Sequence, residues 1–294
     1  MMRGEKAGGH GERCVAVGTL DMAIWDAAAK IAGQPLHRFL AAHLGAAPPA
    51  ATIRAYAGDG YRYPHDDIQR LSDEIKTFTD LGFTHAKIKI GADDLATDLR
   101  RIEAAASQLT NSSHLAVDAM NIYSPNAALK AARALGPHGL WWFEDACDPL
   151  DFETLSRISA TYSGPLASGE TLFSRAEACL LDRYGGLRRG QDILLFDPVH
   201  CYGLTHYIEI IRELTQQGWP RASFWPHGGH LFGLHIVAAI GLGGAEINPL
   251  AFAPFRGVAP GMTITNGHAS LPQTPGIGFE LHNEAWAAFK SLAA

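Results

Sequence analysis

The sequence has 294 residues, and its 24 Lys and Arg against 30 Asp and Glu give a net charge of −6 with histidine neutral. This acidic balance argues against a nucleic-acid-binding protein, because contacts to phosphate groups require a basic surface. The 47% hydrophobic and 18% charged residues exclude a disordered chain and provide for a large core.

No segment of the sequence has the pattern of a membrane span or a secretory signal. Apolar runs are interrupted well before the roughly 20 residues that a bilayer requires, and the first twelve residues are polar and glycine-rich. Scattered cysteines without a C-x-x-C pair are typical of reduced thiols, so we expect a cytoplasmic protein. These cysteines are Cys14, Cys147, Cys179 and Cys201.

The N-terminal part of the chain is expected to be helical and to precede the main domain. After a flexible leader over residues 1–12, apolar residues recur at helical spacing from Thr19 to Gly33, and a second helical stretch covers 36–44. Near the other end, an amphipathic segment contains Trp286 and Phe289. The expected divisions are residues 1–51 as leader and preceding helices, 52–250 as the main α/β domain, and 251–294 as a C-terminal segment.

From Thr52 onward, short strand-like runs alternate with helical windows. The runs that favour strands are 53–57, 86–90, 115–117, 140–143, 166–168, 193–196, 222–225 and 245–247. The windows that favour crossover helices are 67–81, 93–109, 125–135, 151–161, 175–184 and 204–217. Strands recurring every roughly 25 to 30 residues predict a parallel sheet, and eight such units close into a barrel. A doubly wound open sheet is the alternative, but no Gly-rich phosphate turn follows the first two strands.

Three carboxylates stand where three consecutive predicted strands end. Asp118, Glu144 and Glu170 follow one another at intervals of 26 residues, which predicts neighbouring positions on one rim of the barrel. Their negative charges would repel one another, and a hard divalent cation with oxygen ligands would relieve that repulsion. Mg²⁺ is the expected ion, since no cysteine or histidine accompanies the carboxylates. Alternatively, each carboxylate caps the helix that follows it.

Two lysines, Lys87 and Lys89, lie two residues apart on the second predicted strand, so their side chains share one face. A lysine is costly to bury unless it has a partner. One interpretation is a salt bridge from either lysine to a rim carboxylate. The other is that one ammonium lowers the pKa of its neighbour, which then serves as a general base. The two interpretations are compatible.

A histidine and an aspartate, His227 and Asp197, end the seventh and sixth predicted strands. An Asp beside a His can accept the second ring N–H, fix the tautomer and raise the basicity of the ring. We therefore expect His227 to be functional. Capping of the next helix explains His230 equally well, and a zinc site made of the two histidines lacks a third soft ligand nearby.

As an ordered set, these residues resemble the enolase superfamily, in its mandelate racemase branch. The resemblance spans Cys14 to Glu280. Within the branch, the segments at 168–173, 226–230 and 275–280 are most similar to D-tartrate dehydratases. The residues that carry the resemblance are Lys87-Ile88-Lys89, Asp118, Glu144, Glu170, Asp197, His227 and Glu246, with Gly18-Thr19-Leu20-Asp21-Met22-Ala23-Ile24-Trp25-Asp26 ahead of the barrel.

The resemblance implies a (β/α)7β barrel that binds Mg²⁺ through Asp118, Glu144 and Glu170. The ion would bind the substrate carboxylate and stabilise the enediolate that forms when the α-proton leaves. The implied activity is that of a lyase, which dehydrates an acid sugar and most specifically converts D-tartrate to oxaloacetate.

The resemblance also implies roles for individual side chains. Lys89 would be the base, and Lys87 would lower its pKa. His227, oriented by Asp197, would protonate the departing 3-hydroxyl. The implied substrate contacts are Glu246, His230 and Asn121.

The sequence departs from the pattern of this branch in two places. Many relatives have Asp-x-Asn at the third strand, whereas Met120 stands there in this chain and Asn121 follows. Full-length relatives begin with an α+β capping domain. Residues 1–51 are too short for that domain, so we expect a barrel that lacks most of it, and the segment 251–294 would normally complete it.

Three other functions stay open at this point. A racemase or epimerase would use Lys89 and His227 on opposite faces of the substrate. A Schiff-base lyase would use Lys87 or Lys89 without a metal. An inactive truncated barrel would keep the metal ligands but not exclude water. We further expect a small acid-sugar substrate, no nucleic acid or membrane partner, and a homo-oligomer formed through the exposed helix near Trp25.

Overall fold

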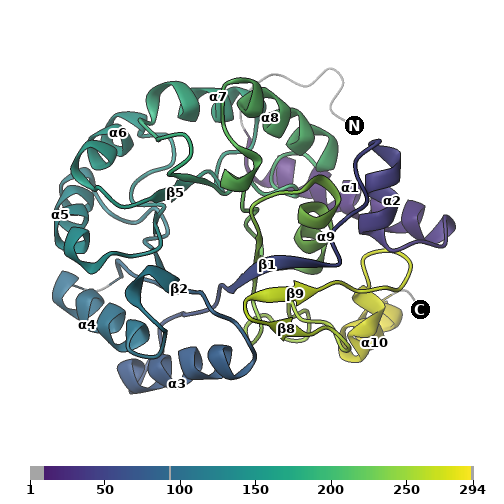
Figure 1. The fold of residues 1–294 in the computed structure, drawn as a ribbon, viewed down its shortest axis with the longest axis horizontal. Helices are drawn as coiled ribbons and strands as arrows, with labels where there is room; N and C mark the ends of the chain where they lie inside the picture. Colours follow the sequence, from purple (N-terminus) through teal and green to yellow (C-terminus); the bar gives the residue numbers. More distant parts are fainter. Residues whose placement is uncertain (1–9, 93, 293–294) are drawn as a thin grey trace.

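The computed structural model describes residues 10–92 and 94–292 and places a ring of helices around a parallel sheet (Figure 1). Most of the expected leader, residues 1–9, lies outside the described residues. The first helix, α1 (Glu12–Ile31), begins seven residues before the expected start at Thr19. It is followed by α2 (Leu36–His43), which begins after Pro35 as predicted.

The strands of the parallel sheet follow the predicted alternation. They are β1 (Thr52–Ala57), β2 (Ala86–Lys89), β3 (Leu115–Asp118), β4 (Phe143–Glu144), β5 (Leu166–Ser168), β6 (Ile193–Leu194) and β7 (Ala245–Ile247). Hydrogen bonding gives the spatial order β6-β5-β4-β3-β2-β1-β7, with every neighbouring pair parallel. All seven strands therefore direct their carboxyl ends to the same side, where a site can form.

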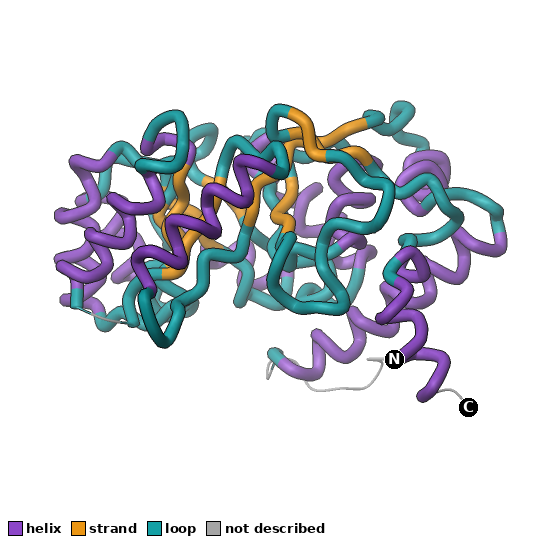
Figure 2. Tube along the Cα trace, turned by 90° about the horizontal axis from the view of Figure 1, so that it is seen from below, coloured by secondary structure: helices purple, strands orange, loops and turns teal. Residues whose placement is uncertain are grey.

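Helices connect successive strands and cover the outside of the sheet, as the view from below shows (Figure 2). Asp93, the expected first residue of one of them, lies outside the described residues; that helix begins at Leu95, and the Asp94 side chain caps it by accepting the Thr97 N–H. The helices are α3 (Asp67–Asp80), α4 (Leu95–Ala106), α5 (Pro125–Leu135), α6 (Phe152–Thr161), α7 (Arg175–Tyr184), α8 (Leu204–Gln216) and α9 (Leu231–Ile240).

The strand predicted at 222–225 is wrong, and in the described residues the strand pairing does not close into a complete barrel. This segment forms a short 3-10 helix, Arg221–Ser223, and joins β6 through one bridge between Leu194 and Phe224. Pro226, next in sequence, has no N–H to donate to a ladder. Two single hydrogen bonds, Gly243 N to Phe224 O and Asn248 N to Gly229 O, connect the segment to the region of β7.

The C-terminal segment is fastened to the first strand of the sheet. A hairpin of β8 (Ile264–Thr265) and β9 (His268–Ser270) pairs antiparallel with β1, with Ile53 opposite Ala269. The predicted amphipathic segment forms the last helix, α10 (Asn283–Leu292).

Large aromatic side chains fill the centre of the sheet. Tyr56, Trp142 and Trp225 are buried together, and small residues on neighbouring strands, such as Ala116 and Ala167, leave room for them. The ammonium of Lys87 lies 5.8 Å from the centroid of the Tyr56 ring. This aromatic layer therefore forms the floor beneath the polar side chains at the strand ends.

All four cysteines are free, and Cys14, Cys147 and Cys201 are buried, as expected for reduced thiols. Within residues 10–92 and 94–292, no helix combines the length and apolarity needed to cross a membrane.

Two buried histidines join α2 to α9. Nε2 of His235 lies 2.9 Å from the carbonyl oxygen of Ile277, and its Nδ1 lies 3.1 Å from both the backbone N and the Nδ1 of His37. Burial lowers the pKa of His37 to about 4. Burial and the neighbouring His37 lower the pKa of His235 to about 3. Both rings are therefore neutral in the folded protein at neutral pH.

We expect the free energy of unfolding to fall as the pH drops from 7 to 5. In the unfolded chain the two histidines take up protons near pH 6.5, so the unfolded state binds more protons in this window. Each histidine contributes a slope of up to about 1.4 kcal/mol per pH unit. Urea unfolding at several pH values should show a shallower slope for His235→Gln than for the native chain. The exposed His65→Gln is the control, and equal slopes for His235→Gln and the native chain would contradict this account.

Candidate active site

Charged side chains from seven neighbouring segments meet at the carboxyl ends of the parallel strands. In order around the ring, they come from β2, β3, β4, the turn after β5, the loop after β6, the loop before α9, and β7. These residues are Lys87 and Lys89, Asp118, Glu144, Glu170, Asp197, His227 and Glu246.

The three predicted metal ligands lie side by side. Lys89 is in register with Asp118, and Asp118 with Glu144. Carboxylate oxygens of Asp118, Glu144 and Glu170 lie within 4.8 Å of one another, and Oε2 of Glu170 is buried without a hydrogen-bond partner. An all-oxygen donor set in which one buried oxygen accepts no hydrogen bond fits a hard cation such as Mg²⁺.

The alternative interpretation of these carboxylates as helix caps is wrong. The residues at the N-caps of α5, α6 and α7 are Ser124, Asp151 and Ser174, each several residues after the carboxylate in question. The carboxylates instead face the interior of the site. Glu144 is held there by the Trp142 indole, whose Nε1–H donates to Oε2 at 2.7 Å.

Both lysines form the predicted salt bridges to the carboxylates. Lys87 Nζ lies 2.5 Å from Glu144 Oε1 and 3.3 Å from Glu246 Oε1, and Lys89 Nζ lies 2.5 Å from Asp118 Oδ2. Burial and the Lys87 ammonium lower the pKa of Lys89, but the surrounding carboxylates outweigh them and raise it above its usual value. We expected Lys87 to lower the pKa of Lys89 overall. That expectation is wrong for this arrangement, because the neighbouring carboxylates raise the pKa by more than Lys87 lowers it.

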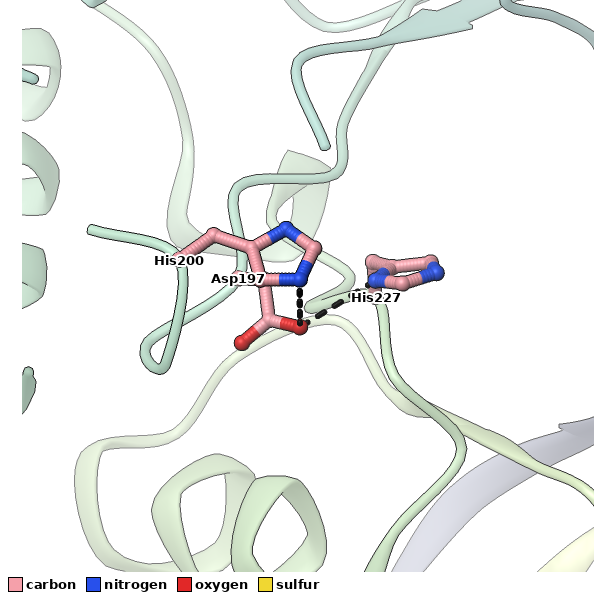
Figure 3. Close-up of side chains that lie close together, drawn as sticks. All are labelled: Asp197, His200 and His227. Atoms are coloured by element: carbon pink, nitrogen blue, oxygen red, sulfur yellow. Dashed lines mark hydrogen bonds and ion pairs between the residues drawn. The ribbon is translucent and has the colours of Figure 1, made fainter. Parts of the chain in front are cut away.

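The histidine and aspartate predicted to act together are in contact (Figure 3). His227 Nδ1 lies 3.1 Å from Asp197 Oδ2, and His227 Nε2 lies 3.5 Å from Glu170 Oε2. Burial lowers the pKa of His227, but the charges of Glu170, Glu246 and Asp197 and the hydrogen bond to Asp197 raise it to about 10. With its side chain 27% exposed, His227 is a protonated ring that a substrate can reach.

Glu246 links the lysines to the histidine segment. Its Oε2 accepts the N–H of Gly228 at 3.2 Å while Oε1 faces Lys87. The backbone just after β1 packs directly against Glu246. A Cβ on Gly58 would lie only 2.4 Å from Cγ of Glu246, so no side chain fits at position 58. A glycine at position 58 is therefore needed for Glu246 to reach both partners.

The other two predicted substrate contacts are already engaged by the protein. Asn121 Nδ2 donates to Asp145 Oδ2 at 3.0 Å and lies 3.5 Å from Thr171 Oγ1. Residue His230 caps α9, with Nδ1 accepting the Gly233 N–H at 3.2 Å. That bond places the ring proton of neutral His230 on Nε2, which is buried without a partner and so is free to donate to a ligand.

Three residues of the site had no clear sign in the sequence. His200 lies in a loop three residues after Asp197, and neither hydrophobic period nor strand position distinguishes it. Asp59 accepts the N–H groups of Leu250 and Ala251 and so ties the end of β1 to the loop after β7. The Tyr61 ring centroid lies 5.4 Å from Lys89 Nζ. For Asp59 and Tyr61, the Gly-Asp-Gly sequence at positions 58–60, directly after the first strand, could have indicated a functional loop.

Comparisons with known proteins show what the whole chain is similar to. A family model described as enolase C-terminal domain-like matches residues 70–285. Arabinonate dehydratase of Saccharolobus solfataricus is 28% identical over 289 residues, which cover 96% of this chain and 74% of that protein. L-talarate/galactarate dehydratase of Salmonella typhimurium is 26% identical over 287 residues, with coverage of 96% and 67%. The solved structure of L-talarate dehydratase from Polaromonas sp. JS666, complexed with Mg and L-glucarate, has a TM-score of 0.75 and 26% identity, and covers 94% of this chain and 72% of that one.

We expect Gly58→Ala to displace the Glu246 carboxylate from Lys87. The backbone angle at Gly58 is not in the left-handed region, so the clash alone should cost about 1 to 3 kcal/mol of unfolding free energy. Urea unfolding measures this loss. Gly136→Ala is the matched control: no atom lies within 4 Å of its added Cβ and its φ is −48°, so its effect should stay within about 0.5 kcal/mol. Equal stability of the two variants would show that Gly58 is not needed for this packing.

Proposed function

Because the chain belongs to the enolase C-terminal domain-like family, we propose that it is a Mg²⁺-dependent acid-sugar dehydratase. One observation carries the proposal. The ring of side chains holds three adjoining carboxylates, with Lys89 on one side of them and the His227–Asp197 pair on the other. A metal-binding triad between a base and an acid is suited to removing a proton beside a carboxylate and expelling a hydroxyl.

Each side chain has a defined part in this reaction. Asp118, Glu144 and Glu170 would hold Mg²⁺, which would supply positive charge to bind the substrate carboxylate. Lys89, in its neutral form, takes the proton from the carbon beside that carboxylate. The electron pair of the broken C–H bond forms a C=C bond as the C–O bond to the adjacent hydroxyl breaks.

His227 completes the elimination by giving a proton to the departing hydroxyl, which leaves as water. The contacts to Asp197 and Glu170 favour the protonated ring that this step requires. In this proposal, Glu246 and the Nε2–H of His230 hydrogen-bond the substrate. Asn121 acts instead by holding Asp145.

The substrate in this proposal is a hydroxylated carboxylic acid. The relatives named arabinonate dehydratase and L-talarate/galactarate dehydratase support that class. Within the class, D-tartrate is the specific candidate, because the segments at 168–173, 226–230 and 275–280 resemble D-tartrate dehydratases. Self-association remains part of the proposal and rests on the exposed Leu20, Ile24 and Ile31 of α1.

A racemase is the second candidate, and the placement of Lys89 and His227 supports it. In the strand order, β1 and β7 separate β2 from the segment that holds His227, so the two groups approach a bound substrate from different directions. A Schiff-base lyase receives less support, since Lys87 is fully buried and ion-paired.

The first test is a screen of acid sugars with excess Mg²⁺, including D-tartrate, arabinonate and galactarate. We expect at least one to lose water and form a 2-keto acid, and we expect EDTA to abolish turnover. Lys89→Met should lower kcat by about 10²- to 10⁴-fold, the usual contribution of a positioned base. Turnover that persists in EDTA, or a screen in which no acid sugar reacts, would contradict the proposal.

The second test separates proton removal from loss of water by following the reaction in D₂O. In His227→Asn, Lys89 can still remove the proton, so we expect deuterium to enter the substrate at the α-carbon while keto-acid formation falls about 10²-fold or more. The exposed His65→Asn serves as control and should behave as the native chain. Deuterium incorporation without water loss in the native chain would instead identify a racemase.

A further inference from the structure

A second group of side chains of metal-ligating type lies beside the carboxylates and contains a histidine that the proposed reaction does not use. Asp197 and His200 come from the loop after β6, and His227 from the loop before α9 (Figure 3). The Asp197 Oδ2 atom lies 3.1 Å from His227 Nδ1 and 3.7 Å from His200 Nε2. One ligand atom from each of the three residues lies within 4.8 Å of the other two. We call these residues the Asp-His-His cluster.

The hydrogen bonding of His200 leaves one nitrogen directed at Asp197 without a bond. Its Nδ1 lies 2.9 Å from the backbone oxygen of Glu170, and a carbonyl oxygen only accepts, so Nδ1 carries the proton. In the neutral ring, Nε2 is then a lone pair that faces the buried, negatively charged Oδ2 of Asp197 at 3.7 Å. Asp197 Oδ2 is already hydrogen-bonded to His227 Nδ1, so a metal ion that binds here displaces the Nδ1 proton of His227 and gains His200 Nε2 as a further ligand.

The other nitrogen of each ring is supported in the way metal-bound histidines usually are. Metal-ligating histidines almost always donate their second N–H to a carbonyl or a carboxylate, which fixes the ring. His200 has the carbonyl of Glu170 for this purpose, and His227 Nε2 has the Glu170 carboxylate 3.5 Å away. Glu170 therefore orients both rings so that their remaining nitrogens converge on Asp197.

We propose that the Asp-His-His cluster binds a borderline-soft divalent metal ion, Zn²⁺ in the first instance, separately from the carboxylates that take Mg²⁺. Two nitrogens and one carboxylate oxygen with one open position are typical of three-ligand zinc sites. Ligand atoms about 2.0 to 2.2 Å from a tetrahedral zinc lie roughly 3.3 to 3.6 Å apart. The separations of 3.1 and 3.7 Å from Asp197 lie near that range, and the ligand atoms of the two histidines lie within 4.8 Å of each other.

The third soft ligand is His200 and not His230, which the sequence offered as a partner for His227. The Nδ1 of His230 is engaged by the Gly233 N–H, and no atom of His230 belongs to the group of converging ligand atoms. Zinc at the cluster would hold His227 and prevent it from donating a proton. If His227 is the acid of the proposed dehydration, Zn²⁺ inhibits that reaction, but binding itself does not depend on the reaction.

The test is a calorimetric titration of the full chain with Zn²⁺. It is done with the Asp118→Asn variant, because zinc also competes for sites rich in carboxylates. We expect one equivalent of Zn²⁺ to bind to Asp118→Asn with release of protons. Adding His200→Gln should weaken binding by at least about 100-fold, since even changes in groups that support a ligand cost 10- to 100-fold. Adding His206→Gln, an exposed histidine on α8, should leave affinity unchanged.

Two results would overturn the proposal: Asp118→Asn that binds no Zn²⁺, or equal affinity with and without His200→Gln. If either variant does not fold, zinc-edge X-ray absorption on the native chain in excess Mg²⁺ decides the matter. Two imidazole nitrogens around the zinc support the cluster, and an all-oxygen shell overturns it. Failure of the acid-sugar screen would leave all of these binding results unaffected.

Discussion

The structure depends on the electrostatic balance among three carboxylates and two lysines at one rim of the sheet. Asp118 and Glu144 are fully buried, and their charges would repel one another without a cation. The ammonium groups of Lys87 and Lys89, each 2.5 Å from one of these carboxylates, supply that positive charge within the chain itself. The same carboxylates can bind a divalent ion in place of the lysines. The charge of that ion would neutralise the carboxylates and weaken the ion pair between Asp118 and Lys89.

The parallel sheet provides this balance through its register. Lys89, Asp118 and Glu144 stand opposite one another on β2, β3 and β4, so the backbone register alone brings one lysine and two carboxylates together. Beneath them, the aromatic layer around Tyr56 and Trp142 excludes water and limits how far the charged groups can move. On the opposite side of Lys87 from Glu144, Glu246 contacts Lys87 and accepts the backbone N–H of Gly228, next to His227.

Much of this arrangement could be predicted from the sequence, because strand ends and spacing determine where a side chain lies in a parallel sheet. The positions of Asp118, Glu144 and Glu170 follow from the interval of 26 residues, and the pairing of His227 with Asp197 follows from neighbouring strand ends. The positions that could not be predicted lie in loops. The segment at 222–225 is apolar like a strand, but Pro226 and a single bridge to β6 leave it outside the ladder.

Long-range contacts account for the remaining differences. The orientation of the His200 ring depends on its hydrogen bond to the backbone carbonyl of Glu170, which is 30 residues away in the sequence. Asn121 lies next to the expected position, yet its amide turns to Asp145 on the adjacent strand end. No local pattern encodes either contact, since both depend on how two loops meet above the sheet.

The most direct measurement of the central claim is a crystal structure of the chain with Mn²⁺, read from its anomalous difference density. Mn²⁺ prefers the same oxygen ligands as Mg²⁺ and is visible by its anomalous scattering. The account predicts one strong peak bound by Asp118, Glu144 and Glu170, with the Lys89–Asp118 distance longer than the 2.5 Å seen here. A map with no peak at these carboxylates, and with both lysine pairs unchanged, would contradict it.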